Sequence, residues 1–375
     1  MYFDFGDRRR GENMSDKKTI VVSSPGRICL FGEHQDYLGL PVIAAAVNMR
    51  AEFSATANGT GVFKIMLPDI GKEEEIDLSR EQEYRSKRDY LRSAVNILRR
   101  DGFKFGEGYD IALTSGIPIG KGCSSSSAIL VAWIGLLSRI ATEGRPLTPG
   151  EAAKYGYFAE VKEFNEPGGM MDHYTSALGG MVYIETKGEI KLSPLAAKLP
   201  GVFVLGDSME PKDTTGVLGS VKGNAVGGMA FAQQTIPGAA WETLGCEGAA
   251  AVAGAPEALR RALTGNLRNR DITREAKAIL DSGAPDPEQI GVLLTQEHAE
   301  LSENLGISTQ RIDAMVSGAL AAGAWGAKIN GSGGGGCMFA YTEETKAEFV
   351  RQAIVSAGGE AALLHIDSGL KEEQR

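Results

Sequence analysis

A loop rich in glycine and serine precedes one of the most apolar stretches of the chain. Residues 118–128 read PIGKGCSSSSA, and the sequence continues with ILVAWIGLL. The first turn of a helix has unpaired backbone N–H groups and a partial positive charge, and glycine lets the backbone approach an anion closely. The pattern therefore predicts a phosphate-binding junction between a loop and a buried helix, with Lys121 adding charge. The alternative is a serine-rich turn that only caps the helix.

The junction does not match the better-known phosphate-binding motifs. Lys121 lies between two glycines, so GxxxxGK[ST] is absent, and no third glycine completes GxGxxG after Gly122. A second glycine-rich run, GSGGGG at residues 331–336, leads into the strand-like CMFAY instead of a helix. A dinucleotide-binding fingerprint is therefore excluded.

Two further windows could carry chemistry. Arg27, Glu33, His34 and Asp36 crowd into a short turn between apolar stretches within residues 25–43. Such a cluster suits recognition of a polyhydroxylated ligand, because each hydroxyl needs a hydrogen-bond partner; the alternative is a solvated loop with a local salt bridge. KINGSGGGGCMFAY, residues 328–341, predicts a loop that approaches another group closely, or else a flexible hinge.

Apolar periodicity predicts the elements that position these windows. Strands are expected at residues 19–24, 41–48, 51–57, 109–115, 202–208, 338–342 and 362–367, with a hairpin formed by 179–186 and 189–194. Helices are expected at 85–100, 126–141, 148–164, 257–282, 287–304 and 308–323, and NEPGGMMD at 165–172 should break the chain. Residues 209–256 should form a mobile loop with one or two helices. The order of elements indicates an α+β fold with mixed sheets in two domains.

Composition excludes several classes of partner. The formal net charge of −9 does not favour DNA or anionic lipid, and no apolar run reaches the roughly 18–20 residues of a membrane span. Residues 1–17 are polar, lack a secretory signal and should form a disordered lead-in. The four scattered cysteines indicate reduced thiols. We expect a cytoplasmic protein.

Taken together and in this order, the three windows resemble the GHMP kinase family, which includes galactokinase, homoserine kinase, mevalonate kinase and phosphomevalonate kinase. PIGKGCSSSSA is similar to the family's ATP loop P-x-G-x-G-L-S-S-S-A, with Cys123 in place of leucine, and NGSGGGGCMF is similar to its C-terminal glycine motif. PGRICLFGEHQDYLG resembles the galactokinase signature G-R-V-N-L-I-G-E-H-T-D-Y-N-G, with Cys29, Gln35 and Leu38 as departures. GGMMDHY resembles G-I-M-D-Q, with His173 in place of glutamine.

The resemblance implies a two-domain fold, with an N-terminal domain at 18–200, a C-terminal domain at 201–375 and the active site between them. It also implies roles for individual residues. The catalytic pair is Asp172 and Arg27, and the substrate-binding residues are Glu33, His34, Asp36 and Gly169. The ATP-binding residues are Gly120, Lys121, Gly122, Cys123, Ser124, Ser125 and Ser126. The Mg²⁺ ligands are Ser126 and Glu160, with Glu163 and Glu166 as rivals.

This set is chemically sensible for phosphoryl transfer, which needs an anion cradle, a metal that bridges phosphate oxygens and a carboxylate that orients the attacking hydroxyl. The galactokinase-like turn favours an ATP-dependent sugar 1-kinase. However, residues 206–221 and 303–316 resemble mevalonate kinase equally well, so mevalonate, another sugar or a uronic acid remain alternatives. A non-catalytic sensor of nucleotide or sugar is an alternative of another class. The expected partners are ATP, Mg²⁺ and a small sugar, with no nucleic acid or membrane, and the chain should be a monomer or homodimer.

Overall fold

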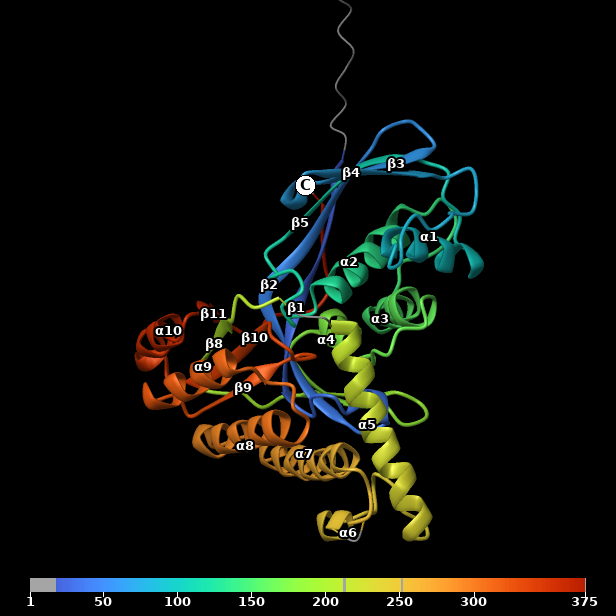
Figure 1. The fold of residues 1–375 in the computed structure, drawn as a ribbon. Helices are drawn as coiled ribbons and strands as arrows, with labels where there is room; N and C mark the ends of the chain where they lie inside the picture. The colour runs from blue at the N-terminus through green and yellow to red at the C-terminus, as the bar shows by residue number, and fades with distance from the viewer. Residues whose placement is uncertain (1–17, 212–213, 251, 375) are drawn as a thin grey trace, which may run out of the picture.

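Two sheets organise the molecule. The computed structural model describes residues 18–211, 214–250 and 252–374 (Figure 1). The larger sheet has the order β12-β1-β2-β5-β3-β4, and β6 pairs with both β2 and β7. Its strands are β1 (Ile20–Phe31), β2 (Val42–Ala57), β3 (Val62–Leu67), β4 (Lys72–Asp77), β5 (Tyr109–Ser115), β6 (Met181–Glu185), β7 (Lys191–Leu195) and β12 (Lys371–Gln374). The pair β3–β5 is parallel, and the other pairs are antiparallel. The sheet is therefore mixed.

The smaller sheet is antiparallel and lies in the C-terminal half. Its order is β11-β8-β10-β9, formed by β8 (Val202–Asp207), β9 (Gly326–Asn330), β10 (Cys337–Thr342) and β11 (Glu360–Leu364). Helices α9 (Gln310–Ala321) and α10 (Ala347–Ser356) pack on this sheet, while α8 (Pro287–Ala299) packs on β9 and on α7 (Glu257–Asp281). Helix α5 (Thr214–Thr235) packs against α7 and runs down the front of Figure 1 towards α6 (Cys246–Ala250).

One buried helix supports the serine loop. Helix α2 (Ser125–Ile140) packs on β1 and β2 and is flanked by α1 (Tyr90–Arg100), α3 (Pro149–Tyr157) and α4 (Met171–Leu178). Its Trp133 is fully buried and contacts Phe53 of β2 with a ring-centroid distance of 5.1 Å. Burial of almost every position from Ala128 to Leu137 explains why this part of the helix is apolar, and it fixes the loop that leads into the helix.

The predicted α+β fold with two domains and mixed sheets is confirmed. Its boundary at residue 200 stays a prediction, and the final strand β12 returns to pair with β1 of the larger sheet. The predicted lead-in at residues 1–17 lies outside the described residues. In the described part of the chain, no helix combines the length and apolar character needed to cross a bilayer. All four cysteines are free thiols.

Several elements differ from the sequence prediction. The strands expected at 41–48 and 51–57 are one strand, β2, and the helix expected at 148–164 becomes a π-helix over Phe158–Lys162. The break expected at 165–172 contains the start of α4, because residues 165–170 form the turn and Met171 already begins the helix. Other elements were not predicted: β3, β4, β9, β12 and α10. Residues 209–256 contain α5 and α6 as well as loops.

Candidate active site

The serine loop reaches α2 through left-handed backbone. Gly120, Gly122 and Ser124 have φ angles of 69°, 97° and 60°, a region that glycine adopts easily and serine rarely. Strand β1 passes close by, since a Cβ on Gly26 would lie 2.8 Å from the carbonyl oxygen of Cys123. The loop is therefore held between the start of α2 and β1, with the unpaired N–H groups of the first helical turn at its end.

The serine loop borders a cavity of about 620 Å³. Gly120, Gly122 and the serines Ser124, Ser125 and Ser126 line it. Two predicted ATP residues do not. The Lys121 ammonium pairs with Asp207 at 2.9 Å, and Cys123 is fully buried in the core. The cradle is thus built from backbone and small hydroxyl groups, and Lys121 is engaged with the C-terminal half.

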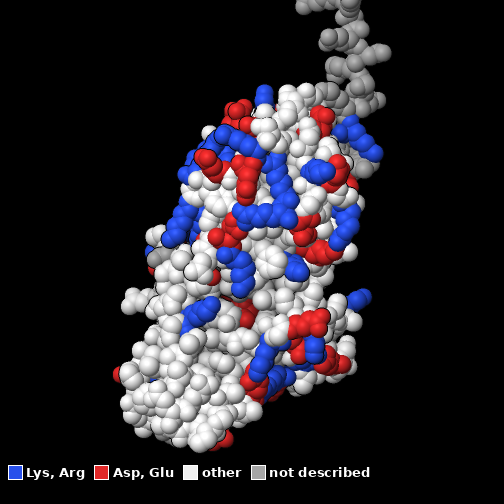
Figure 2. Space-filling model, turned by 90° about the vertical axis from the view of Figure 1, so that its right-hand side faces the viewer, with Lys and Arg blue, Asp and Glu red and all other residues white. Residues whose placement is uncertain are grey.

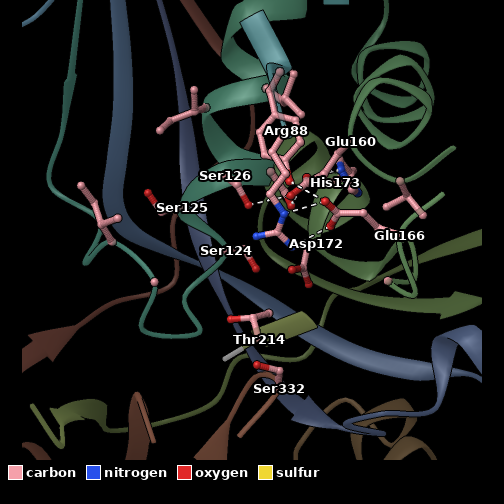
Figure 3. Close-up of a pocket in the computed structure, with 18 of the residues that line it drawn as sticks. Arg88, Ser124, Ser125, Ser126, Glu160, Glu166, Asp172, His173, Thr214 and Ser332 are labelled. Atoms are coloured by element: carbon pink, nitrogen blue, oxygen red, sulfur yellow. Dashed lines mark hydrogen bonds and ion pairs between the residues drawn. The ribbon is translucent and has the colours of Figure 1, made fainter. Parts of the chain in front are cut away.

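Asp172 and Arg27 form the predicted catalytic pair. The Asp172 Oδ1 atom accepts a hydrogen bond from Arg27 Nε at 2.8 Å and lies 2.8 Å from Nη2. Arg27 also donates to the carbonyl oxygen of Gly122, so the same guanidinium holds both the aspartate and the serine loop. Burial opposes ionisation of Asp172, but the Arg27 charge acts together with neighbouring charges and hydrogen-bond donors, and their combined effect lowers the pKa of Asp172. Asp172 is therefore an ionised carboxylate at neutral pH, and it faces the cavity (Figure 3).

Glu160 is fixed by three side chains. Ser126 donates to its Oε1 at 2.7 Å and Ser127 to its Oε2 at 2.8 Å, while His173 Nε2 lies 2.8 Å from the same Oε2 (Figure 3). Burial opposes ionisation, but His173 and the two hydroxyls lower the pKa of Glu160. The π-helix that carries Glu160 is a distortion that occurs frequently at functional sites.

The two predicted Mg²⁺ ligands are adjacent, and both present hard oxygen atoms to the cavity. In the described residues, no cluster of three or more His, Cys, Asp and Glu side chains suits a metal. A site of one carboxylate and one hydroxyl fits Mg²⁺, which takes its remaining oxygens from phosphates and water. The rivals are engaged elsewhere: Glu166 binds Arg88, and Glu163 binds Arg100.

The polar turn after β1 also lines the cavity. We call residues 32–36 the substrate loop. His34 has a left-handed φ of 66°, its Nε2 lies 3.2 Å from the Ser332 carbonyl oxygen, and its Nδ1 lies 2.7 Å from the Tyr37 hydroxyl. Because a carbonyl can only accept, Nε2 carries a proton and donates to Ser332, while Nδ1 shares a hydrogen bond with the Tyr37 hydroxyl.

Asp36 is packed against a glycine of the α4 turn. Its Oδ1 accepts from the Tyr37 N–H at 2.9 Å and its Oδ2 from the Met171 N–H at 3.1 Å. A Cβ on Gly169 would lie 1.9 Å from Oδ2, so any other residue at this position would displace the Asp36 carboxylate. Burial raises the pKa of Asp36, although the two N–H groups partly offset this effect. Each Asp36 oxygen keeps a free lone pair for a ligand hydroxyl.

The structure brings the other predicted residues together in the one cavity. Glu33, His34, Asp36, Gly169 and Asp172 all line it, together with Glu160. Arg27 lies behind Asp172 and is 4% exposed. Glu166, named from the sequence as a rival metal ligand, also lines the cavity, and sequence reasoning missed further lining residues: Tyr37, Arg88, His173, Thr214, Leu218 and Ser332. His173 was detectable because it departs from the family motif, whereas Thr214 and Ser332 reach the site through the tertiary fold (Figure 3).

Arg88 lines the cavity and connects its own segment to two others through hydrogen bonds. It donates to the two oxygens of Glu166 at 2.6 and 2.8 Å and to the Thr215 hydroxyl at 2.7 Å. Its own φ is 79°, so this bridge fixes an unusual backbone conformation. The loop before α1, the turn before α4 and the start of α5 are thereby joined.

Three family descriptions match the sequence. They are the GHMP kinases N terminal domain at residues 89–180, the GHMP kinases C terminal domain at 276–361 and the galactokinase galactose-binding signature at 11–56. These matches cover the serine loop, the glycine-rich motif and the substrate loop.

Sequence relatives point to the same family, and a solved structure shares the fold. The chain is 34% identical to a mevalonate kinase of Thermococcus gammatolerans over 95% of this chain and 98% of that protein. It is 28% identical to a galactokinase of Actinobacillus pleuropneumoniae, covering 89% and 88%. Its fold matches the galactose complex of Lactococcus lactis galactokinase with a TM-score of 0.83 and 20% identity, covering 94% and 95%. The chain therefore belongs to the GHMP kinases, a family of ATP-dependent phosphotransferases that act on hydroxyl groups of sugars or of mevalonate.

Proposed function

We propose that the protein is an ATP-dependent sugar kinase, and most simply a galactokinase-type enzyme that phosphorylates the anomeric hydroxyl of a monosaccharide. The observation that carries this proposal is the lining beside Asp172. Asp36 is held in the cavity against Gly169, with His34 in the same loop. These oxygen and nitrogen atoms suit an acceptor that carries several hydroxyls, because each hydroxyl needs a partner once it is removed from water.

Different residues of this chain have different roles in the proposed phosphoryl transfer. The serine loop and the start of α2 bind the phosphates of ATP through backbone N–H groups and hydroxyls. The ionised Asp172 accepts a hydrogen bond from the attacking hydroxyl and orients it towards the phosphate, and Arg27 keeps the carboxylate ionised. Ser126 and Glu160 are the donors for Mg²⁺, which when bound neutralises charge on the phosphate oxygens.

Mevalonate is the second candidate acceptor. The supporting observation is the 34% identity to the mevalonate kinase of Thermococcus gammatolerans, which is higher than the 28% identity to the galactokinase of Actinobacillus pleuropneumoniae. Against it stands the substrate loop, since a mostly aliphatic acid would leave the remaining hydrogen-bonding capacity of Asp36 unused in a buried site. A non-catalytic sensor is less well supported, because Asp172, Arg27, Ser126 and Glu160 are all present and assembled.

The test is a coupled assay for ADP release with Mg-ATP and a panel of acceptors. The panel contains galactose, N-acetylgalactosamine, glucuronate, galacturonate, arabinose, mevalonate and homoserine. Turnover with one sugar supports the proposal. Turnover with mevalonate alone rejects the sugar assignment, and ATP binding without turnover of any acceptor favours the sensor.

A further inference from the structure

A buried ion cluster connects the substrate loop to the C-terminal half. We define the cluster as Glu33 of the substrate loop, Glu297 of α8 and Lys328 of β9. The three residues are 3%, 0% and 0% exposed. Buried charges are expensive unless they are paired and hydrogen-bonded, so such a cluster requires a structural explanation.

The contacts within the cluster end on the backbone of the substrate loop. Glu297 Oε1 accepts from the N–H groups of Gly32 and Glu33 at 3.1 and 3.0 Å. The carboxylate of α8 therefore replaces a strand partner at the point where β1 ends and the substrate loop begins.

Lys328 completes the cluster from β9. Its Nζ donates to the Cys29 carbonyl oxygen at 2.8 Å and lies 3.6 Å from Glu33 Oε2 and 3.8 Å from Glu297 Oε1. The Glu33 Oε2 atom also accepts from the Gly331 N–H at 2.7 Å. Glu33 is thus directed into the C-terminal half as well as lining the cavity, so its carboxylate is largely committed to this cluster.

Helix α7 binds the same loop through amides. Asn269 Nδ2 donates to the Glu33 carbonyl oxygen at 2.9 Å, and Gln35 Nε2 donates to the Asn266 carbonyl oxygen at 2.7 Å. Three C-terminal elements therefore hold a segment whose centre, His34, has a left-handed φ of 66°. A non-glycine residue keeps such a conformation only where its surroundings enforce it.

We propose that Glu297 and Lys328 are positioning residues that act through the substrate loop on the binding of the phosphoryl acceptor. Neither residue is among those that line the cavity, and their effect comes from fixing the backbone that carries His34 and Asp36. This inference rests on the proposed function in one respect, namely that the acceptor binds at the substrate loop.

The charge balance adds a pH dependence to this geometry. Two carboxylates share one ammonium, and burial raises the pKa of Glu297 to about 7 against the opposing effect of Lys328. The other titratable or charged groups around the cluster are Cys29 and Arg27 from β1 and His298 from α8, while α7 contributes the Asn266 carbonyl and the Asn269 side-chain amide. Ionisation of Glu297 near neutral pH therefore changes the charge that faces the loop backbone.

Hydrogen exchange of the full chain tests the positioning role without any acceptor. Glu297→Ala removes the acceptor of two loop N–H groups, so amides of the segment 32–38 should exchange about tenfold faster. Glu297→Gln keeps an accepting oxygen and should exchange as the wild type does at pH 6, where Glu297 is mostly protonated. Met315→Ala, a truncation in the core under α9, is the matched control and should leave both this segment and the serine loop unchanged.

Lys328 needs a variant that preserves the charge of the cluster. Lys328→Met combined with Glu297→Gln keeps the net charge at −1, but it removes the ammonium that binds the Cys29 carbonyl oxygen and faces Glu33. Loop exchange should therefore rise above that of Glu297→Gln alone. If Glu297→Ala does not fold, Glu297→Gln still decides. After division by the intrinsic exchange rates, the protection of the loop amides should differ between pH 6 and pH 8 in the wild type and stay constant in Glu297→Gln. The proposal would be overturned if the amides of segment 32–38 exchanged equally fast in the wild type and in Glu297→Ala. It would also be overturned if Met315→Ala accelerated their exchange as much as Glu297→Ala does.

Kinetics separate this proposal from the proposed function. With whichever panel acceptor is turned over, Glu297→Ala should raise the KM for that acceptor about tenfold or more and leave the KM for ATP within about twofold. Failure of every acceptor would reject the kinase assignment and leave the exchange result standing. Normal exchange in the variants, together with turnover of a sugar, would reject the positioning role alone.

Discussion

At the scale of single residues, one guanidinium contacts both Asp172 and the serine loop. Arg27 pairs with Asp172 and also donates to Gly122 of the serine loop. The groups that we propose to bind phosphate and to orient the hydroxyl therefore share one support, which catalysis by positioning requires. The sequence predicted both residues of this pair from the family motifs.

Asp172→Asn should lower kcat by about a hundredfold or more, because the neutral amide is a poor acceptor for the proton of the attacking hydroxyl. Affinity for ATP should change little, since the serine loop is intact. Steady-state kinetics combined with an ATP-binding titration measures both. Turnover near that of the wild type would show that Asp172 is not the group that orients the hydroxyl.

The proposed Mg²⁺ ligand Ser126 can be compared with its neighbour Ser125 in the serine loop. Ser126→Ala should raise the Mg²⁺ concentration needed for half-maximal activity several-fold, about the effect of one lost oxygen donor. Ser125→Ala is the control, since Ser125 lines the same cavity while its neighbours Ser126 and Ser127 bind Glu160. Equal Mg²⁺ titrations for the two variants would remove Ser126 from the metal site.

At the scale of elements, the turn into α4 places Asp172 beside the substrate loop. Gly168 and Gly169 are adjacent in this turn but differ in their surroundings. A Cβ on Gly169 would overlap Asp36, whereas a Cβ on Gly168 would make ordinary contact with Val161 at 3.5 Å. The two glycines therefore provide a matched pair of variants.

Gly169→Ala should raise the KM for the acceptor about tenfold or more, because Asp36 must move out of place to avoid the new methyl group. Gly168→Ala should behave as the wild type, and the KM for ATP should stay unchanged in both. The measurement is a pair of saturation curves, one for acceptor and one for ATP. A similar effect of both substitutions would point to general damage of the turn.

Elements with strong local signals were predictable. Strand β5 (Tyr109–Ser115) and the capping box of α3, in which Thr148 accepts from the Glu151 N–H, agree with the sequence prediction. Strand β4, KEEEID, was missed because its charged side chains stay exposed in a strand at the sheet edge, where no apolar alternation is required. Helix α4 was missed because two glycines immediately before it resemble a longer loop.

At the scale of the whole molecule, long-range contacts complete the site. Glu33, Glu297 and Lys328 are far apart in sequence, and each alone resembles a surface charge. Only the packing of α8 and β9 on the end of β1 brings them together. The family motifs could therefore predict the serine loop and Asp172, but not Glu297 and Lys328, which hold the substrate loop from the C-terminal half.

The buried cluster also affects global stability. The pKa of Glu297 rises from its ordinary value of 4.5 to about 7 on folding. Between these values the folded state binds more protons than the unfolded state, so the stability that this group contributes is present at low pH and is lost as the pH rises through about 7. Glu297→Gln cannot ionise and escapes this loss.

The free energy of unfolding of Glu297→Gln should therefore increase relative to the wild type from about pH 5 to about pH 8. Urea unfolding at several pH values measures this difference. Glu348→Gln is the control, because the pKa of the exposed Glu348 is lowered to about 2 and its charge is constant over this range. A difference for Glu297→Gln that does not vary with pH would contradict a neutral-range pKa in the cluster.

The most direct test of the sugar-kinase assignment is a competition between two acceptors in one reaction. Equal concentrations of galactose and mevalonate are incubated with Mg-ATP and the protein, and phosphorus NMR identifies the phosphorylated product. A site built around Asp36, Gly169 and Asp172 predicts a sugar phosphate with phosphate on the anomeric oxygen. Phosphomevalonate as the product would contradict the account and would show that the substrate loop does not select a polyhydroxylated acceptor.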